Sequence, residues 1–347
     1  MSKVNWMTKA AAPAQTDLFG TSYEPTPSSR RPVDSTTRPS AATSHTSGPV
    51  WPDDATMLRH LEDSGNYRVL RRLVPRPVVG RDKLVTIARA KDQKLGLIVD
   101  AETTGLDHRA DEIIELGMVL FSYDDDGIGE VIDVFSALRE PVQPISPEIT
   151  RITGITAEMV LGQSIDPDAV ARFIQPADCV IAHNAKFDRP FCERLAPRFD
   201  AKPWGCSVAE VNWADLGFEG WKLTYLVGQC GLFHNGHRAI DDCHALLEVL
   251  AYEAQPGEDA FRALIASMKQ RRCRVWAHNS PFETKNILKA RGYRWSDGSD
   301  GRLKSWWIEV DEDAFEEECR FLREEIYSSE TTMHFEWLTA IERYRSI

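Results

Sequence analysis

The sequence lacks the long apolar run that a membrane-spanning helix needs. No window approaches about 18 uninterrupted apolar residues, and the first residues lack the apolar centre of a secretory signal. The seven cysteines are odd in number and form no Cys-x-x-Cys pair, which argues against a disulfide framework. We therefore expect a protein without membrane contact in a reduced, cytoplasmic compartment.

Basic residues are fewer than acidic ones, 41 Lys and Arg against 53 Asp and Glu. The 347 residues carry a formal net charge of −12, which argues against a protein that coats nucleic acid by bulk electrostatics. An enzyme acting on nucleic acid stays compatible with this charge, because metal-dependent phosphodiesterases gather carboxylates and let bound cations meet the phosphate. With 42% hydrophobic residues, the chain has enough apolar material for at least one sizeable core.

Composition and periodicity divide the chain into parts. We expect a disordered tail at 1–50, a helical basic extension at 51–92, the main domain at 93–256, and a small α+β accessory module at 270–347. The apolar positions after Asp53 predict two short helices in the extension, broken near Gly65. Within the extension, nine basic and two acidic residues lie between Arg68 and Lys94. Such an excess fits a solvated face, and a nucleic-acid contact is the alternative.

The apolar pattern of the main domain predicts a mixed sheet. Residues 95–100 form a continuous apolar run that ends in a carboxylate, and 112–123 and 128–138 predict the next two strands of an antiparallel meander. Helical patterns then alternate with the short apolar run 179–182. This order is typical of an α/β fold in which helices cover a mixed sheet.

The first segment with catalytic potential ends the first strand. Asp100 and Glu102 are two residues apart, so their side chains point to the same face of a strand. Charge at the end of an apolar strand is costly unless it is compensated, and a divalent cation is the natural partner of two carboxylates. An Asp-x-Glu pair alone is common, so a purely structural role is the alternative.

Two further segments add polar groups. Asp188 falls in the first turn of the helix that follows the strand 179–182. His237 stands five residues before Asp242, where the last long helix of the domain begins. Histidine ordinarily titrates near neutrality, which suits the abstraction of a proton.

In this order and spacing, the segments 100–106, 182–188 and 237–242 resemble the DEDDh 3′–5′ exonucleases, the DnaQ-like family of the replicative proofreading subunit and of ribonuclease T. The segment 144–156 is also similar to that family, and the resemblance covers about residues 94–254. It implies an α/β, ribonuclease H-like mixed sheet flanked by helices. It also implies an enzyme that releases nucleoside 5′-monophosphates from single-stranded 3′ ends, in replication or repair, with DNA favoured over RNA.

The resemblance assigns roles to these residues. Asp100, Glu102, Asp188 and Asp242 would hold two Mg²⁺ or Mn²⁺ ions, and His237 would be the general base. Two ions about 3.5–4 Å apart can clamp the attacking and leaving oxygens while the histidine takes a proton from water. Family spacing favours Asp242 over the adjacent Asp241. Substrate contacts are expected from residues beside the motifs: Thr103, Thr104, Gly105, Leu106, His183, Asn184 and Phe187.

Other interpretations stay open at this point. Cys230, His234, His237 and Cys243 lie within a short stretch that suggests zinc, but their spacing fits no usual zinc pattern. An exoribonuclease is an alternative, because discrimination of the 2′-hydroxyl leaves no motif. An inactive nucleic-acid-binding adaptor is another, although the presence of all five catalytic-type residues argues against it.

The two ends of the chain add one hypothesis each. Gln15, Leu18 and Phe19 of the tail resemble the pentapeptide that binds the bacterial sliding clamp. We expect Leu18 and Phe19 to enter a hydrophobic pocket while Gln15 bonds at its edge, with modest affinity because the tail must be ordered. Five tryptophans in the last 72 residues indicate either the core of a small domain or surfaces on which bases stack.

Overall fold

A computed structural model describes residues 53–82, 93–255, 257–299, 301–327 and 332–345. Gln15, Leu18 and Phe19 lie outside these residues, so the clamp-binding hypothesis and the expected disorder of 1–50 stay predictions. Residues Asp54–Ile347 belong to one compact unit. Within the described ranges, no helix is long and apolar enough to cross a membrane. All seven cysteines are free thiols.

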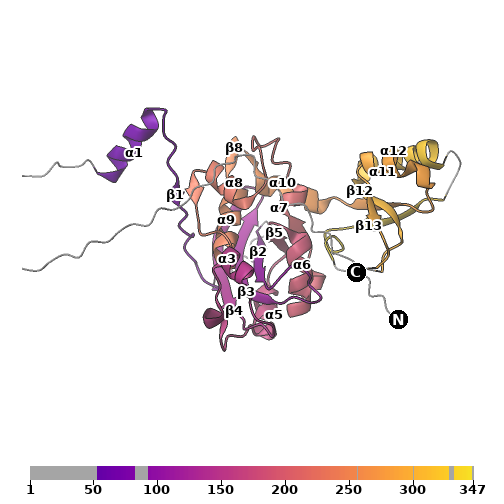
Figure 1. Cartoon of the computed structure of the whole chain (residues 1–347). Coiled ribbons are helices and arrows are strands. Elements are labelled where there is room, and N and C mark those ends of the chain that lie inside the picture. The colour runs from indigo at the N-terminus through magenta and orange to yellow at the C-terminus, as the bar shows by residue number, and fades with distance from the viewer. Residues whose placement is uncertain (1–52, 83–92, 256, 300, 328–331, 346–347) are drawn as a thin grey trace, which may run out of the picture. The chain divides into compact units, whose positions relative to one another are not determined.

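A five-stranded mixed sheet forms the centre of the main domain, in the order β4-β3-β2-β5-β6. The strands are β2 (Lys94–Thr103), β3 (Ile113–Asp124), β4 (Gly127–Leu138), β5 (Cys179–Ala182) and β6 (Trp204–Cys206). The first three pair antiparallel, whereas β5 joins β2, and β6 joins β5, in parallel. The expected α/β, ribonuclease H-like mixed sheet is therefore confirmed (Figure 1).

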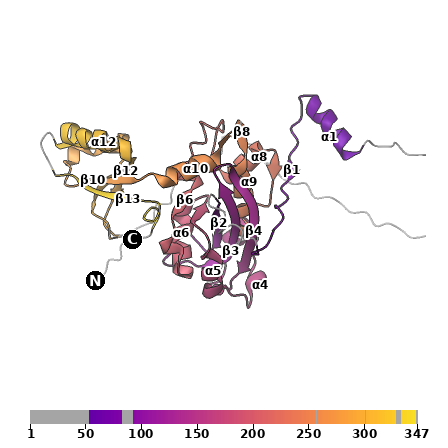
Figure 2. The same cartoon turned by 180° about the vertical axis from the view of Figure 1, so that it is seen from behind.

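Helices cover both faces of this sheet, which explains why β2 and β3 are buried along nearly their whole length. The α-helices among the described residues are α1 (Asp54–Asp63), α3 (Pro147–Thr153), α4 (Ala157–Val160), α5 (Pro167–Ile174), α6 (Ala185–Leu195), α7 (Ser207–Glu210), α8 (Leu223–Gln229), α9 (Ala239–Ala251), α10 (Ala260–Lys269), α11 (Lys285–Ala290) and α12 (Phe315–Phe321). Leu97 and Val99 pack with α5 and α6, while Ile98 packs with α8, α9 and α10 on the opposite face (Figure 2).

The parallel pairing of β2 with β5 brings the carboxyl ends of both strands to one edge of the sheet. β5 leads through Asn184 into α6, whose first turn carries Asp188. The start of α9 lies against β3, where a Cβ at Gly117 would stand 2.4 Å from the backbone of Ala239. The fold thus gathers three segments that are far apart in the sequence.

The extension before the main domain is helical only at its start. α1 forms as expected, but the expected second helix is wrong, because Arg71–Arg72 form β1, which pairs in parallel with β7 (Leu232–Phe233). The Leu73 amide also donates to the Phe233 carbonyl at 2.8 Å. So short a segment has little helical stability of its own, and these main-chain bonds determine its conformation instead.

Three arginines of the extension fasten it to the main domain. Arg68 donates hydrogen bonds to the carbonyls of Gly228 and Gln229. Arg76 forms an ion pair with Glu248, and Arg81 forms one with Asp133. At these positions, the local excess of positive charge serves contacts within the protein. Neither a solvated face nor a nucleic-acid contact is needed to explain them.

The C-terminal module is a four-stranded antiparallel sheet in the order β11-β12-β10-β13. Its strands are β10 (Arg272–Ala277), β11 (Arg294–Ser296), β12 (Ser305–Asp311) and β13 (His334–Leu338). With α11 after β10 and α12 after β12, the chain follows the split βαβ arrangement. Leu288 and Leu322, from the helical segments, pack with Val275 on one face of this sheet.

Two segments beyond residue 256 pack into the main domain. Phe261 of α10 is buried, with its ring centroid 5.2 Å from that of Tyr123. Near the C-terminus, Arg343 pairs with Glu210 at 2.7 Å, and both side chains are buried. We therefore propose that the main domain extends to Lys269 and that the chain returns to it after β13.

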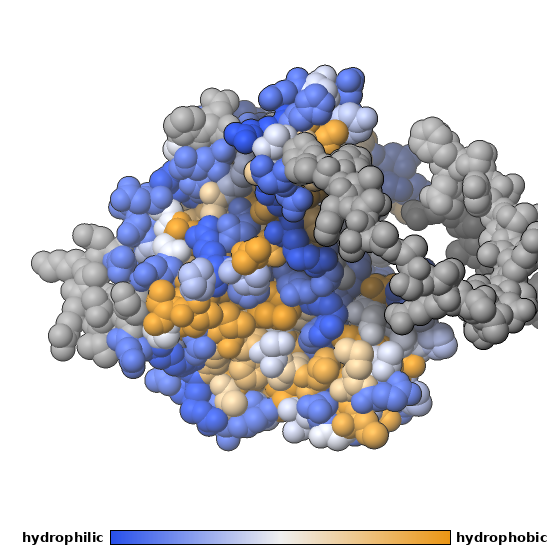
Figure 3. Space-filling view, turned by 90° about the vertical axis from the view of Figure 1, so that its left-hand side faces the viewer, coloured by the Kyte–Doolittle hydropathy of each residue, from blue (hydrophilic) through white to orange (hydrophobic). Residues whose placement is uncertain are grey.

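Apolar side chains also remain on the surface. On the face shown in Figure 3 they gather in patches that polar side chains border. The most exposed apolar side chains of the described residues include Val74, Val142 and Leu161. Exposed apolar residues are usual on folded proteins, and no role is assigned to these three.

Candidate active site

A cleft of about 960 Å³ opens at the edge of the sheet where β2 and β5 end. Residues from all three motif segments line it: Asp100, Glu102, Leu106, His183, Asn184, Phe187, Asp188, His237 and Asp242. The structure therefore brings the five residues with expected catalytic roles into one cavity. It leaves Thr103, Thr104, Gly105 and Asp241 outside the lining.

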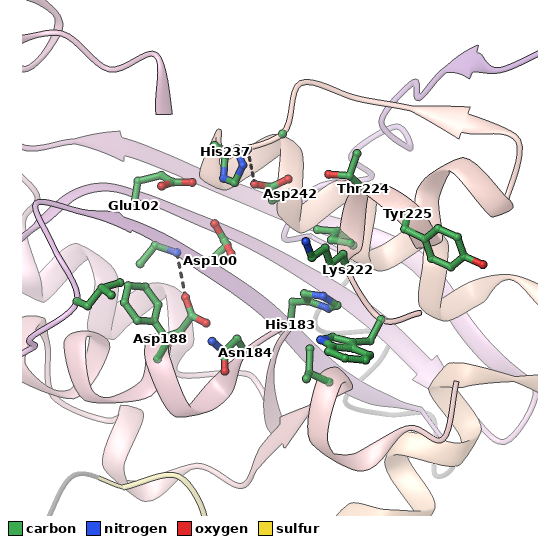
Figure 4. A pocket seen from close by; sticks show the side chains of 17 residues that line it. Asp100, Glu102, His183, Asn184, Asp188, Lys222, Thr224, Tyr225, His237 and Asp242 are labelled. Atoms are coloured by element: carbon green, nitrogen blue, oxygen red, sulfur yellow. Dashed lines mark hydrogen bonds between the residues drawn. The ribbon is translucent and has the colours of Figure 1, made fainter. Parts of the chain in front are cut away.

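Four carboxylates converge in this cleft. Asp100 lies between Glu102 and Asp242 on one side and Asp188 on the other (Figure 4). The Ala101 amide donates to Oδ1 of Asp188 at 3.2 Å. The bond fixes α6 to β2 at the centre of the cluster.

Proximity and burial make the negative charge of these carboxylates costly. Burial, and then the charges of Asp188 and Asp242, raise the pKa of Asp100 well above its usual range. Burial also raises the pKa of Asp188 to about 8, although the bond from Ala101 favours the charged form. For Glu102, burial and the charge of Asp242 raise the pKa to about 7. The cluster therefore holds protons that a divalent cation would displace.

Asp242 is held at both carboxylate oxygens. Its Oδ1 lies 2.6 Å from Nε2 of His234, and its Oδ2 accepts a hydrogen bond of 2.8 Å from the backbone N–H of His237. An ionised carboxylate only accepts hydrogen bonds, so whenever Asp242 is charged the donor in this contact is Nε2 of His234. His234 is therefore a positioning residue, whereas its place in the sequence, close to Cys230, His237 and Cys243, suggested only a zinc ligand.

His237 reaches the cluster from a left-handed backbone conformation, with φ at 63°. This conformation is uncommon for residues other than glycine, and it is held here by the bond to Asp242. In the described part of the chain, one group could hold a metal through three close ligands, namely Glu102, His237 and Asp242, whose atoms lie within 4.8 Å of one another. Cys230 and Cys243 are not in it, so the zinc interpretation has no support.

A buried acid fixes the start of α9. Glu115 on β3 is 1% exposed and accepts hydrogen bonds from the Arg238 guanidinium at 2.8 Å and from the Ala239 N–H at 3.0 Å. Its partners directly follow His237 in the chain. Glu115 thereby sets the position of the turn that carries His237 and leads to Asp242. No sequence motif marked this contact, since it joins residues 123 positions apart.

The loop after β2 differs from the expectation. The Thr103 hydroxyl donates to the Gly105 carbonyl at 2.6 Å, and the Thr104 hydroxyl lies 3.1 Å from Asp111. A Cβ at Gly105 would stand 2.5 Å from the same Asp111 carboxylate. These three residues therefore support the loop from behind the cleft. Leu106 alone projects, with 86% of its surface exposed.

The loop after β5 lines the cleft as expected. Nδ1 of His183 lies 2.7 Å from the Ser207 hydroxyl, and burial lowers the pKa of His183 to about 4. Its ring is therefore neutral near pH 7. Asn184 and Phe187 line the same wall, and the Phe187 ring packs on Phe191 with centroids 5.1 Å apart.

One wall of the cleft was not foreseen from the sequence. It is formed by Trp221 and Lys222, which precede α8, and by the first residues of that helix, Leu223, Thr224 and Tyr225. Trp221 is 59% exposed, and Lys222 lies on the same side of the cleft as His183 (Figure 4). An exposed aromatic residue next to a lysine is a pattern of nucleic-acid-binding surfaces, which could have drawn attention to this segment.

Known proteins share this domain. The family model described as "Exonuclease", RNase_T, matches residues 97–250. Over 160 residues, the chain is 34% identical to the DNA polymerase III subunit epsilon of Treponema pallidum, covering 43% of this chain and 72% of that protein. Over 168 residues, it is 32% identical to the PolC-type DNA polymerase III of Clostridium perfringens, covering 45% of this chain but only 11% of that protein.

Two solved structures are also similar. One is exonuclease X in complex with 5′ overhanging duplex DNA, with 24% sequence identity and a TM-score of 0.37. The match covers 49% of this chain and 99% of the exonuclease X chain. The other is a product-bound exonuclease I, with 16% sequence identity and a TM-score of 0.40. The match covers 53% of this chain and 51% of the exonuclease I chain.

Proposed function

Because this chain belongs to the DnaQ-like exonuclease family, we propose that it removes nucleotides from the 3′ ends of single-stranded DNA and releases nucleoside 5′-monophosphates. The observation that carries this proposal is the cleft in which Asp100, Glu102, Asp188 and Asp242 meet His237. The match to a DNA polymerase III subunit supports DNA over RNA, and a role in replication or repair. A cytoplasmic location belongs to the same proposal.

The donor set fits a site for divalent metal. The carboxylates of Asp100, Glu102 and Asp188 all have raised pKa values, so the cluster lacks a compensating positive charge. Together with Asp242 they supply only oxygen ligands, which Mg²⁺ and Mn²⁺ prefer. When bound, two such ions would stabilise the charge that develops on the phosphate and lower the pKa of water.

The remaining chemistry comes from the chain itself. His237 is exposed at the cleft and close to Glu102 and Asp242, where it would take the proton from the attacking water as general base. The neutral ring of His183 would donate a hydrogen bond rather than a charge. Lys222 adds a cation near the acidic cluster, suited to a phosphate oxygen. Leu106 and Trp221 offer exposed apolar surface to the terminal bases.

The proposal is tested on end-labelled single strands. A 5′-labelled DNA strand should shorten from its 3′ end in Mg²⁺ or Mn²⁺ and stay intact in EDTA, and chromatography should identify nucleoside 5′-monophosphates. An RNA strand of matched sequence tests the exoribonuclease alternative. Digestion from the 5′ end, or a rate that EDTA leaves unchanged, would contradict the proposal. Metal-independent binding without any hydrolysis would instead favour the adaptor.

A second hypothesis concerns partners. Gln15, Leu18 and Phe19 would tether the nuclease to a bacterial sliding clamp, and tethering raises the local concentration of the enzyme at DNA. A peptide of residues 10–24 should bind the cognate clamp with Kd in the micromolar range, on the order of −8 kcal/mol. The same peptide with Leu18→Ala and Phe19→Ala is the control, and equal binding by both peptides would refute the hypothesis.

A further inference from the structure

The C-terminal module covers only one face of its sheet with its own helices. The core beneath α11 and α12 includes Val275 and Ile308 but neither Trp276 nor Trp307. These two tryptophans are register partners on the central strands β10 and β12, with ring centroids 6.1 Å apart. Because side chains alternate along a strand, both rings belong to the opposite face.

Cations gather around Trp307 on that face. The guanidinium carbons of Arg274, Arg294 and Arg302 lie 5.3, 5.2 and 5.2 Å from its ring centroid. Arg274 is neutralised by Glu309 at 2.7 Å. By contrast, Arg294 is exposed, and no carboxylate among the described residues forms an ion pair with it. A positive charge beside an aromatic ring is therefore open to an anion.

A pocket of about 330 Å³ opens at this cluster. Its lining consists of Lys186 of α6, Trp295, which is 52% exposed, and Arg294, Ser296, Asp297, Arg302 and Trp307. Three cationic side chains therefore face one carboxylate, that of Asp297. Lys186 is a second exposed cation without an ion pair among the described residues. The first turn of α6 therefore lines both this pocket, through Lys186, and the catalytic cleft, through its neighbours in the sequence.

We propose that this pocket binds the sugar–phosphate backbone of the same single strand whose 3′ end enters the cleft. The inference rests on the proposed function and extends the substrate site onto the C-terminal module. Arginine and lysine recognise phosphate by charge and by several N–H donors. Trp295 supplies an exposed ring on which a base stacks, and aromatic rings interleaved with cations are typical of single-strand binding surfaces.

Binding measurements on the full chain test this proposal. A fluorescent single strand of about 20 nucleotides is titrated in EDTA at several salt concentrations. Arg294→Gln should raise Kd about three- to tenfold and reduce the slope of log Kd against log salt by about 0.7, as expected for one lost phosphate contact. Arg294→Lys should restore the slope. Trp295→Ala should raise Kd but leave the slope of log Kd against log salt at the wild-type value. The control is Lys289→Gln, which removes an exposed cation from α11.

A minimal substrate separates this inference from the proposed function. A thymidine 5′-monophosphate aryl ester carries no further nucleotides and cannot extend from the cleft to the pocket. If the wild-type protein with Mn²⁺ does not hydrolyse the ester or single strands, the proposed function fails. If it hydrolyses them, yet Arg294→Gln binds the long strand with wild-type Kd and slope, the inference is overturned. An equal loss in Lys289→Gln would overturn it as well, and unchanged melting temperatures exclude unfolding as the cause.

Discussion

Nε2 of His234 lies 2.6 Å from Oδ1 of Asp242. The other ring nitrogen of His234 is buried and has no hydrogen-bond partner among the described residues, so the bond to Asp242 is the polar anchor of this ring. The carboxylate in turn depends on His234 for one of its two fixed contacts. His234, which the sequence did not place at the catalytic site, therefore orients Asp242, which the sequence did.

Replacement of His234 tests this dependence. His234→Ala should lower kcat or the affinity for Mg²⁺ about ten- to a hundredfold, because a ligand without its supporting hydrogen bond is less well placed. His234→Gln should recover part of the loss, since its amide N–H can occupy the place of Nε2. Steady-state rates against Mg²⁺ concentration measure both effects. Wild-type kinetics for His234→Ala would show that the bond has no catalytic role.

The central carboxylate should be indispensable for hydrolysis. We expect Asp100→Asn to lower kcat by a factor of about a thousand or more, because the amide supplies neither the charge nor the ligand strength of the carboxylate. The metal-free variant should melt at a higher temperature than the wild type at pH 8, since one of several crowded charges is gone. An active, folded Asp100→Asn protein would remove the basis of the proposed mechanism.

The raised pKa values predict how stability depends on pH without metal. Glu102 and Asp188 have pKa values of about 7 and about 8 in the fold, against about 4 when unfolded. The folded state therefore binds more protons than the unfolded chain in this window, and the free energy of unfolding falls as pH rises from about 4 to 8. Calorimetry in EDTA should show a melting temperature that falls as the pH is raised from about 4 to 8.

Added Mg²⁺ should reverse this trend. The ion binds the deprotonated carboxylates, so it should raise the melting temperature more at pH 8 than at pH 5. The Asp100→Asn protein provides the comparison and should respond less to the ion. A melting temperature that is flat with pH and insensitive to Mg²⁺ would contradict the assignment of a metal site to this cluster.

Glu115 should matter for both stability and rate. Glu115→Ala would leave the Ala239 N–H and the Arg238 guanidinium without their acceptor at the start of α9, at a cost of about 2–4 kcal/mol in the free energy of unfolding. It should also lower kcat, because the turn carrying His237 loses its anchor. Denaturant unfolding and single-strand hydrolysis measure the two effects. Glu148→Ala, at an exposed site on α3, is the control and should change neither.

The buried pair of Arg343 with Glu210 predicts that the end of the described chain stabilises the main domain. Arg343→Met should destabilise the protein by about 3–5 kcal/mol, because it leaves the buried carboxylate of Glu210 without its cationic partner. The double variant Arg343→Met with Glu210→Gln should recover much of this loss. A coupling free energy near zero in this double-mutant cycle would show that the pair contributes nothing.

The sequence predicted those parts of the fold and site that depend on local spacing. Apolar runs located every strand of the main sheet except β6, and short motifs identified the five residues that meet in the cleft. The contact of Glu115 could not be foreseen, since it depends on how α9 packs against β3. The contact of His234 depends on how the turn before α9 folds back onto the first turn of that helix. The failure of the second helix in the extension has the same origin, because pairing with β7 outweighs weak local propensity.

The partner of Glu210 is translated 133 residues after it. At about 5–20 residues per second, a ribosome needs about 7–27 seconds to add that length of chain. The strands of the main sheet and α6 precede Glu210 in the chain, and α9 is synthesised within this interval. All of them are therefore complete before Arg343 can pair with the carboxylate of Glu210. The main domain therefore completes its core only after the C-terminal module has left the ribosome, and the order of folding does not simply follow the order of the domains.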